Sequence, residues 1–326
     1  MGRLPIEWLA GDQLLAFNYH SVGETPSPHV KHLYPVTTPD QFRSHIGFFV
    51  ENFNLLSYSE LLQHKLDGKP FPRRSAFLSF DDGLAEIAGD VRTILKEHNA
   101  PCAFFISTDL INNKTMMIRH RVSLCIEKID TLGGSAGMGI SGDVVKSVGE
   151  AVGGHIRDRR GLERSVSGLG DADERALDTV CEILEVDVAR YLREERPYVT
   201  EDQILMLQED GFTIGAHGTD HRQLGELVAP EIAKQIVGSC EVIAQLTQTQ
   251  STPFAFPFTG RAVDREFLTD LREENPVVGL IFDTQGLHDD ADFVVNRVGI
   301  GQKHPTRALR EAVGQRLILR TRGIMR

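Results

Sequence analysis

The chain has 326 residues, of which 41% are hydrophobic and 25% charged, and its formal net charge is -11. This composition is that of a globular protein with one large α/β domain or two smaller ones, and the acidic balance disfavours nucleic acid as a partner. There is no apolar run of about 18 residues that could span a bilayer. Residues 1–20 lack the apolar core of a secretory signal, so we expect a cytoplasmic protein.

Short apolar segments alternate with amphipathic ones along most of the chain. Residues 14–22 predict a first strand, and residues 40–53 predict a helix with its apolar side chains on one face. Further strands are predicted at 76–80, 101–107, 213–217, 253–257, 277–282 and 293–300, and further helices at 84–98, 231–246 and 264–274. This alternation is typical of a β/α barrel or a doubly wound sheet, in which chemistry takes place at the carboxyl ends of the strands.

The pattern changes after residue 114, where apolar residues recur at helical spacing and strand patterns are hard to find. We therefore divide the chain into a first barrel segment, a mostly helical insertion, a second barrel segment and a basic C-terminal helix, at 1–114, 115–197, 198–305 and 306–326. Within the insertion, Gly137–Gly142 (GMGISG) matches the letters of a dinucleotide-binding fingerprint. That fingerprint requires a preceding strand, whereas the preceding residues are charged and helix-like, so we interpret the segment as a linker.

The last residues of the chain are basic. Residues 306–326 contain six arginines and one glutamate. Such a segment could contact an anionic membrane surface. We favour a helix that packs on the protein and keeps its arginines in solvent.

Polar residues cluster after two of the predicted strands. One strand is followed by Asp81, Asp82 and Gly83, which alone is ordinary turn chemistry. A later strand ends at His217, and His221 follows four residues on, so both imidazoles can converge on one metal ion. Two histidines and a strand-end carboxylate form the ligand set of a catalytic zinc-type site with an open position for water.

This combination resembles the polysaccharide deacetylases, the family built on the chitooligosaccharide deacetylase homology domain. The family's motif T-F-D-D-G corresponds to Ser79–Gly83, and its motif H-[S/T]-x-x-H corresponds to His217–His221, with glycine in the hydroxyl position. Its third motif, around Pro-Tyr-Gly, corresponds to Phe256–Gly260. The likeness covers residues 15–112 and 199–300, and it implies a distorted β/α barrel of the deacetylase type with a helical insertion.

The resemblance also implies an activity and a set of ligands. The expected reaction is metal-dependent removal of the N-acetyl group from an N-acetylated sugar or glycan, which releases acetate and a free amine. Zn²⁺ is the expected metal, with Co²⁺, Ni²⁺ and Mn²⁺ as alternatives. By this likeness Asp81 is the catalytic base, and the metal ligands are Asp82, His217 and His221.

The third motif supplies groups that would contact the substrate. The backbone N–H of Phe258 would stabilise the oxyanion, and Pro257 and Phe258 would line the binding site. The arginine that usually belongs to this motif and holds the base is replaced by Ala255, so Arg297 is our candidate for that role.

The general acid requires a separate assignment, because the family's late histidine is missing from its usual frame. His304 lies close to that place and is the reserve candidate. The segment Phe17–Val22 (FNYHSV) resembles the first strand of a circularly permuted branch, that of the poly-N-acetylglucosamine deacetylases, in which this histidine lies near the start of the chain. His20 is therefore the candidate acid.

Three other interpretations stay open. The protein could be a non-catalytic metal- or sugar-binding protein on the same fold, or an amidase or deformylase that acts on another acyl group. The motifs could also form a structural metal site in an unrelated α/β protein. The sugar is not specified by the sequence, and the substrate could be a glycan, a nucleotide sugar, a lipid-linked saccharide or an antibiotic-type amino sugar.

Overall fold

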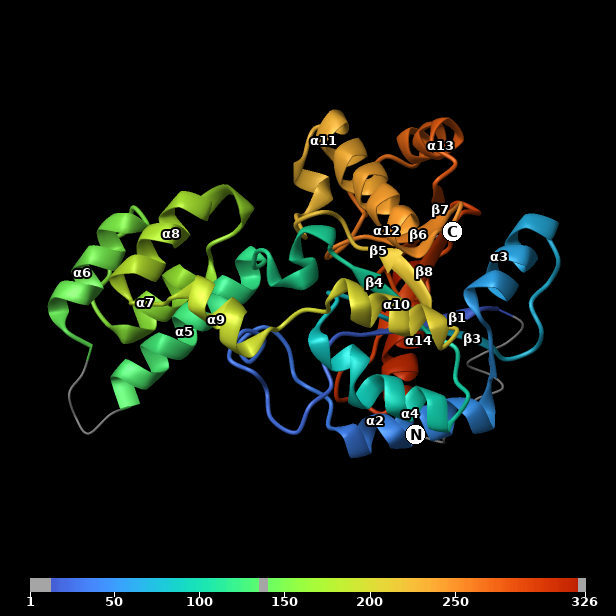
Figure 1. Cartoon of the computed structure of the whole chain (residues 1–326), viewed down its shortest axis with the longest axis horizontal. Helices are drawn as coiled ribbons and strands as arrows, with labels where there is room; N and C mark the ends of the chain where they lie inside the picture. The colour runs from blue at the N-terminus through green and yellow to red at the C-terminus, as the bar shows by residue number, and fades with distance from the viewer. Residues whose placement is uncertain (1–12, 135–139, 322–326) are drawn as a thin grey trace. The chain divides into compact units, whose positions relative to one another are not determined.

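The computed structural model describes residues 13–134 and 140–321. The chain divides into two compact units (Figure 1). One unit consists of residues 1–24, 37–112 and 198–326, and the other consists of residues 25–36 and 113–197. We call them the barrel unit and the helical unit.

The barrel unit is built on parallel strands: β1 (Leu15–Tyr19), β2 (Asn54–Leu55), β3 (Ser75–Phe80), β4 (Ala103–Ile106), β5 (Thr213–Ala216), β6 (Thr252–Ala255), β7 (Val278–Asp283) and β8 (Val294–Gly299). Strand β1 pairs with both β8 and β3, which closes the sheet into a ring. Strand β2 pairs only with β3 and lies outside the ring, which therefore has seven strands. The predicted distorted β/α barrel is confirmed.

Helices surround this ring (Figure 1). They are α2 (Pro39–Asn52), α3 (Tyr58–Asp67), α4 (Asp90–Glu97), α10 (Glu201–Glu209), α11 (Ala229–Ala233), α12 (Ser239–Thr247), α13 (Arg265–Glu274) and α14 (Pro305–Thr321). Helix α2 shows why they form, because Thr38 caps its first turn in a capping box with Gln41. Its apolar face packs on the strands, where the rings of Phe49 and Phe17 lie 4.8 Å apart. Burial of apolar side chains of this kind stabilises the barrel.

Short segments complete the barrel unit: η1 (Ala85–Ala88), η2 (Thr108–Asn113, which reaches the unit boundary), η4 (Leu224–Glu226) and η5 (Lys234–Gly238), the last a π-helical turn. The sequence predicted one helix over 84–98. The structure divides it into η1 and α4 at Gly89, whose φ of -107° and ψ of -109° are not helical.

The helical unit has its own apolar core. Its helices are α5 (Ile118–Gly134), α6 (Gly142–Ala151), α7 (Arg159–Ser167), η3 (Asp171–Asp173), α8 (Glu174–Ile183) and α9 (Val188–Glu195). They bury Val122, Ile129, Leu162, Leu177 and Val180, among others. Part of the segment 137–142 lies outside the described residues, and helices α5 and α6 flank it. A dinucleotide-binding turn would instead follow a strand.

Residues 25–36 belong to the helical unit through contacts that are distant in sequence. The Lys31 ammonium lies 2.7 Å from the Glu127 carboxylate, and the hydroxyl of Ser123 donates to the carbonyl of Pro28 at 2.6 Å. These contacts tie the segment after the first strand to helix α5.

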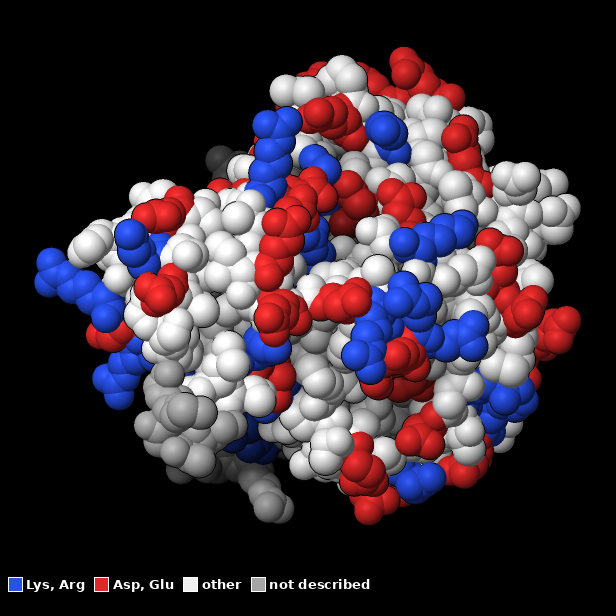
Figure 2. All heavy atoms as spheres, turned by 60° about the vertical axis from the view of Figure 1, so that its left-hand side comes forward, with Lys and Arg blue, Asp and Glu red and all other residues white. Residues whose placement is uncertain are grey.

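The described part of the C-terminal segment forms helix α14, whose buried side chains include Ala308, Leu309 and Ala312. Arg316 pairs with Asp289 at 2.8 Å. Among the described residues, no helix combines the length and apolarity that crossing a bilayer requires. In Figure 2, basic and acidic side chains are interspersed over the coloured surface.

Candidate active site

The closed ring brings the carboxyl ends of its strands together, and the predicted site residues follow directly from those ends. Tyr19 of β1 pairs with Phe80 of β3, so His20 lies beside Asp81 and Asp82. The backbone N–H of Asp81 donates to the Tyr19 carbonyl at 3.0 Å, which continues the ladder to this point. Parallel pairing of the strands therefore brings side chains from three distant sequence motifs together at one end of the ring.

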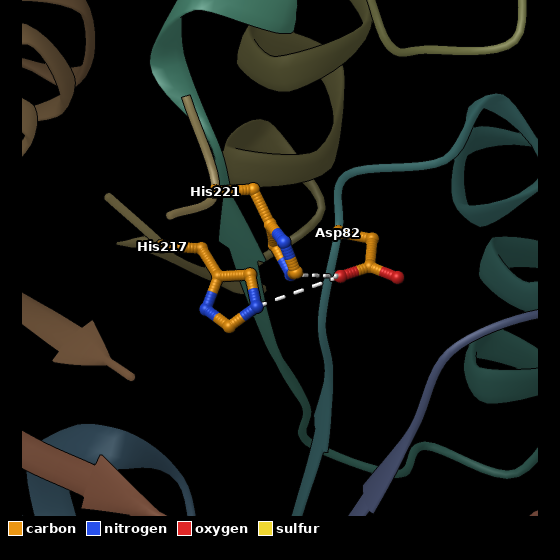
Figure 3. A group of neighbouring side chains, drawn as sticks. All are labelled: Asp82, His217 and His221. Carbon is orange, nitrogen blue, oxygen red and sulfur yellow. Dashed lines mark ion pairs between the residues drawn. The ribbon is translucent and has the colours of Figure 1, made fainter. Parts of the chain in front are cut away.

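Asp82, His217 and His221 form one compact group of buried side chains (Figure 3). Oδ1 of Asp82 lies 3.5 Å from Nε2 of His217 and 3.1 Å from Nε2 of His221. All three potential ligand atoms lie within 4.8 Å of one another. This spacing suits a single ion that contacts all three at about 2 Å.

The hydrogen bonding of His217 shows that the group fits a cation. Its Nδ1 lies 2.8 Å from the carbonyl oxygen of Ala255, which can only accept, so Nδ1 carries the proton. In the neutral ring, the lone pair of Nε2 then faces the Asp82 carboxylate, an arrangement that a cation between them stabilises. Burial raises the pKa of Asp82, but its interactions with His217 and His221 hold that pKa well below its ordinary value. The donor set is that of a divalent metal site of the zinc type.

Asp81 faces a buried guanidinium instead of the histidine pair. Nη1 of Arg297 lies 2.6 Å from Oδ1 of Asp81, and Nη2 lies 2.9 Å from Oδ2. Asn18 donates a further bond to Oδ2 at 3.2 Å. Burial alone would raise the pKa of Asp81, but the Arg297 charge holds it below its ordinary value. The carboxylate is thus kept ionised, as a base requires.

Arg297 itself is completely buried and held from several sides. Its side chain is 0% exposed. It also donates to the hydroxyl of Ser79 at 3.0 Å, and the Phe105 ring centroid lies 5.1 Å from its guanidinium carbon. A side chain from β8 therefore occupies the position at Asp81 that Ala255 cannot fill.

Three residues of this site have left-handed backbone conformations, which cost energy in any residue other than glycine. The φ angles are 74° for Asp82, 63° for His221 and 56° for Phe258. Strained residues of this kind collect at functional sites, where the surrounding structure holds them in place. Phe258 is also 41% exposed, and its ring centroid lies 4.9 Å from that of His221, so an apolar surface borders the ligand group.

The two candidate acids lie in different places. His20 is half-buried and interacts electrostatically with both Asp81 and Asp82. His304 is exposed, and its ring packs on Phe48 of α2 with centroids 4.9 Å apart. His20 is therefore the better candidate for the acid, because it interacts electrostatically with the aspartate pair, whereas the ring of His304 packs on Phe48.

The segment after His20 is fixed by an acid that the sequence did not single out. The hydroxyl of Ser21 donates to Oε1 of Glu86 at 2.6 Å. Burial raises the pKa of Glu86. This contact holds the turn that follows β1 against the segment that follows the Asp81–Asp82 pair.

Asp283, at the end of β7, is a second acid that sequence reasoning missed. It is completely buried, and its Oδ1 accepts from the backbone N–H of Gly260 at 2.9 Å and from the hydroxyl of Thr259 at 3.1 Å. Its Oδ2 accepts from Arg265 at 3.1 Å and from Gln285 at 2.8 Å. One carboxylate thus organises the loop of the third motif. A carboxylate that ends a predicted strand, as Asp81 does, was the signal that could have identified it.

Asp283 links that loop to the guanidinium that holds Asp81. The hydroxyl of the next residue, Thr284, donates to the carbonyl of Phe258. The backbone carbonyl of Asp283 accepts from Nε of Arg297 at 3.4 Å. The end of β7, at Asp283 and Thr284, therefore supports both the conformation of Phe258 and the orientation of Arg297.

We expect Asp283→Asn to destabilise the protein by about 1–3 kcal/mol, because an amide N–H₂ would face donors that need a carboxylate oxygen. Urea unfolding monitored by circular dichroism measures this change. Asp270→Asn, an exposed change on α13, should leave the free energy of unfolding within about 0.5 kcal/mol of the wild type. Equal stability of the Asp283 and Asp270 variants would show that the carboxylate does not support the loop.

A second group of potential metal ligands lies within the helical unit and consists of His32, Glu127 and Asp130. Glu127 already pairs with Lys31 at 2.7 Å, and Asp130 with Arg159 at 2.6 Å. These cations neutralise the carboxylates, so we interpret the group as a surface ion-pair network.

Comparison with known proteins agrees with this geometry. The sequence profile of the polysaccharide deacetylase family matches residues 172–275, which include His217, His221 and Pro257. No curated protein matches the sequence. The Streptococcus pyogenes deacetylase PplD, solved in complex with acetate, is 13% identical with a TM-score of 0.57, over 92% of this chain and 97% of that chain.

Two further solved structures share the fold. A de-N-acetylase from Aggregatibacter actinomycetemcomitans is 14% identical with a TM-score of 0.55, over 92% of this chain and 99% of that chain. IcaB from Ammonifex degensii is 13% identical with a TM-score of 0.53, over 93% of this chain and 97% of that chain. The match to the family profile over residues 172–275 and the shared fold support the predicted polysaccharide deacetylase family and its circularly permuted branch.

Proposed function

We propose that this protein is a metal-dependent hydrolase that removes the N-acetyl group from an N-acetylated sugar or glycan. The observation that supports this most strongly is the buried Asp81–Arg297 pair beside the group Asp82, His217 and His221. A metal-binding or sugar-binding module would have little use for an ionised carboxylate held in this way next to potential ligands. The pair is what general-base catalysis of amide hydrolysis requires.

In this proposal Asp82, His217 and His221 hold the metal, which we expect to be Zn²⁺ because two imidazoles and one carboxylate are typical ligands of catalytic zinc. When bound, a divalent metal lowers the pKa of a water molecule and polarises the acetyl carbonyl. Asp81 accepts the proton from the attacking water. Arg297 and Asn18 orient its carboxylate, since each donates to it.

The remaining groups act on the acetyl and amine sides of the scissile bond. The backbone N–H of Phe258 donates to the developing oxyanion, and the loop with Pro257 and Phe258 borders the substrate. The sugar amine leaves poorly unless it is protonated, so His20 donates a proton to the nitrogen as the C–N bond breaks. The products are acetate and the free amino sugar.

The proposed substrate class is an N-acetylated sugar in a glycan, a nucleotide sugar or a lipid-linked saccharide. The likeness to a de-N-acetylase supports loss of an acetyl group from nitrogen. Acetate release from a panel of these three kinds of compound tests the proposal. Metal-dependent release from any of them would support it, and a protein that releases acetate from none would instead suggest another acyl group or a binding role.

We expect a chelator to abolish acetate release and added Zn²⁺ to restore it, while the far-UV circular dichroism spectrum of the metal-free protein stays that of a folded chain. The barrel core is formed by apolar side chains apart from the ligand group, so we expect the chain to keep its fold without the metal. A structural metal site would behave differently, because its removal would unfold the protein along with the loss of activity.

A further inference from the structure

One buried glutamine holds the loop that carries both histidines of the ligand group. Gln235 is 6% exposed. Its Oε1 accepts a hydrogen bond from the backbone N–H of Thr219 at 2.8 Å. Its Nε2 donates to Oδ1 of Asp220 at 2.7 Å. The two bonds fix the middle of the segment between His217 and His221.

The loop is shaped to accept this amide closely. Gly218 has a φ of +75°, and a Cβ atom at this position would lie 3.0 Å from Oε1 of Gln235. That contact would be tighter than most real Cβ contacts. Glycine therefore allows the glutamine to approach, but it also leaves the loop backbone with more conformational freedom to lose on folding.

The rest of the loop's support comes from the other side. The hydroxyl of Ser107 donates to the carbonyl of His217 at 2.8 Å, and the N–H of Asp109 donates to the carbonyl of Thr219 at 2.8 Å. These residues, which follow β4, hold carbonyl oxygens of the loop. Gln235 holds an N–H group, so it supplies a restraint that they do not.

A local irregularity of the helix presents Gln235 to the loop. The sequence predicted one continuous helix over 231–246, whereas the structure has the π-helical turn η5 between α11 and α12. Gln235 lies within that turn, and the hydroxyl of Ser239 donates to its carbonyl at 2.6 Å. π-Helical turns are rare and frequently occur at functional sites, because the extra residue redirects side chains.

We propose that Gln235 is a positioning residue for the metal. It contacts neither ion nor substrate, and it acts by fixing the loop so that His217 and His221 face the same point as Asp82. This inference rests on the metal site of the proposed function. Residues that orient metal ligands contribute to affinity because ligands that are already in place lose less conformational freedom on binding.

The test is the Zn²⁺ affinity of the full chain, measured by competition with a chromophoric chelator. We expect Gln235→Ala to weaken binding by about 10- to 100-fold. The matched control is Gln208→Ala, since Gln208 also donates from its amide, at 2.8 Å to the carbonyl of Thr247, but lies in α10. We expect this control to bind Zn²⁺ as the wild type does.

A second pair of variants keeps the test decisive if Gln235→Ala fails to fold. In Gln235→Glu the side chain can still accept from Thr219, but it faces the Asp220 carboxylate, so we expect Zn²⁺ binding about tenfold weaker. In Gln235→Glu/Asp220→Asn a donor again faces an acceptor, and we expect affinity to return towards that of the wild type.

Two outcomes would overturn the inference. If the glutamine variants bind Zn²⁺ as tightly as the wild type, Gln235 has no positioning role, although the proposed function can still hold. If the wild type itself binds no Zn²⁺ or other divalent metal, the proposed metal site fails and this inference fails with it. Circular dichroism of each metal-free variant separates a loss of affinity from a loss of fold.

Discussion

Asp81→Asn should lower acetate release by about 10²- to 10⁴-fold, because an amide cannot accept the proton of the attacking water. The substitution keeps the size of the side chain and leaves Asp82, His217 and His221 unchanged. We therefore expect the variant to bind one metal ion per chain, as the wild type does. Acetate assays combined with metal analysis of the purified variant measure both quantities.

The matched variant is Asp82→Asn, one residue along the same turn. We expect it to lose metal as well as activity, because the carboxylate Oδ1 lies near both histidine nitrogens. Asp81→Asn would then lose activity but keep its metal, whereas Asp82→Asn would lose both. This difference is what the roles of base and metal ligand require. An Asp81→Asn protein with wild-type activity would contradict its role as the base, and one without metal would place Asp81 among the ligands.

Arg297→Met should destabilise the protein by about 3–5 kcal/mol, because it leaves the Asp81 carboxylate buried without its cationic partner. Both side chains of the pair are almost fully buried, with 0% of Arg297 and 2% of Asp81 exposed. Methionine retains much of the volume of the arginine stem, so loss of charge is the main effect. The free energy of unfolding, obtained from urea titrations, measures it.

A double-mutant cycle shows whether the pair itself causes this loss. We expect Asp81→Asn/Arg297→Met to be more stable than Arg297→Met alone, since no unpaired charge then remains buried. The control is Arg43→Met, because Arg43 and Glu97 form a pair at 3.3 Å whose side chains are 45% and 48% exposed. Its cost should be about 0–1 kcal/mol. Additive effects of Asp81→Asn and Arg297→Met would contradict the pairing.

The sequence predicted the barrel, and it predicted that several polar residues lie together at one end of it, because both depend on local patterns. Apolar runs fix the strands, and polar residues that follow them must meet at one end of a parallel ring. Asp81, Asp82 and His217 are candidates that this reasoning singles out. The assignment of Arg297 needed more than pattern, because only the pairing of β1 with both β3 and β8 brings β8 to Asp81.

The features that sequence reasoning missed depend on contacts between distant residues. Strand β2 is two residues long, too short for any periodicity. Residues 25–36 join the helical unit through side-chain contacts to α5 and α9, which leave no signal in the composition. Asp283 and Gln235 act on loops that lie 23 and 16 residues away in the chain. Their roles follow from hydrogen bonds that the sequence alone does not specify.

The most direct test of the proposed function is the ratio of acetate to new primary amine released from an N-acetylated oligosaccharide by the zinc-loaded protein. We expect one amine for each acetate, with both lost on chelation and in Asp81→Asn. Acetate without amine would mean cleavage of an ester instead of an amide. Release of neither product, from this oligosaccharide and from nucleotide-linked and lipid-linked N-acetylated sugars, would contradict the proposed deacetylase function.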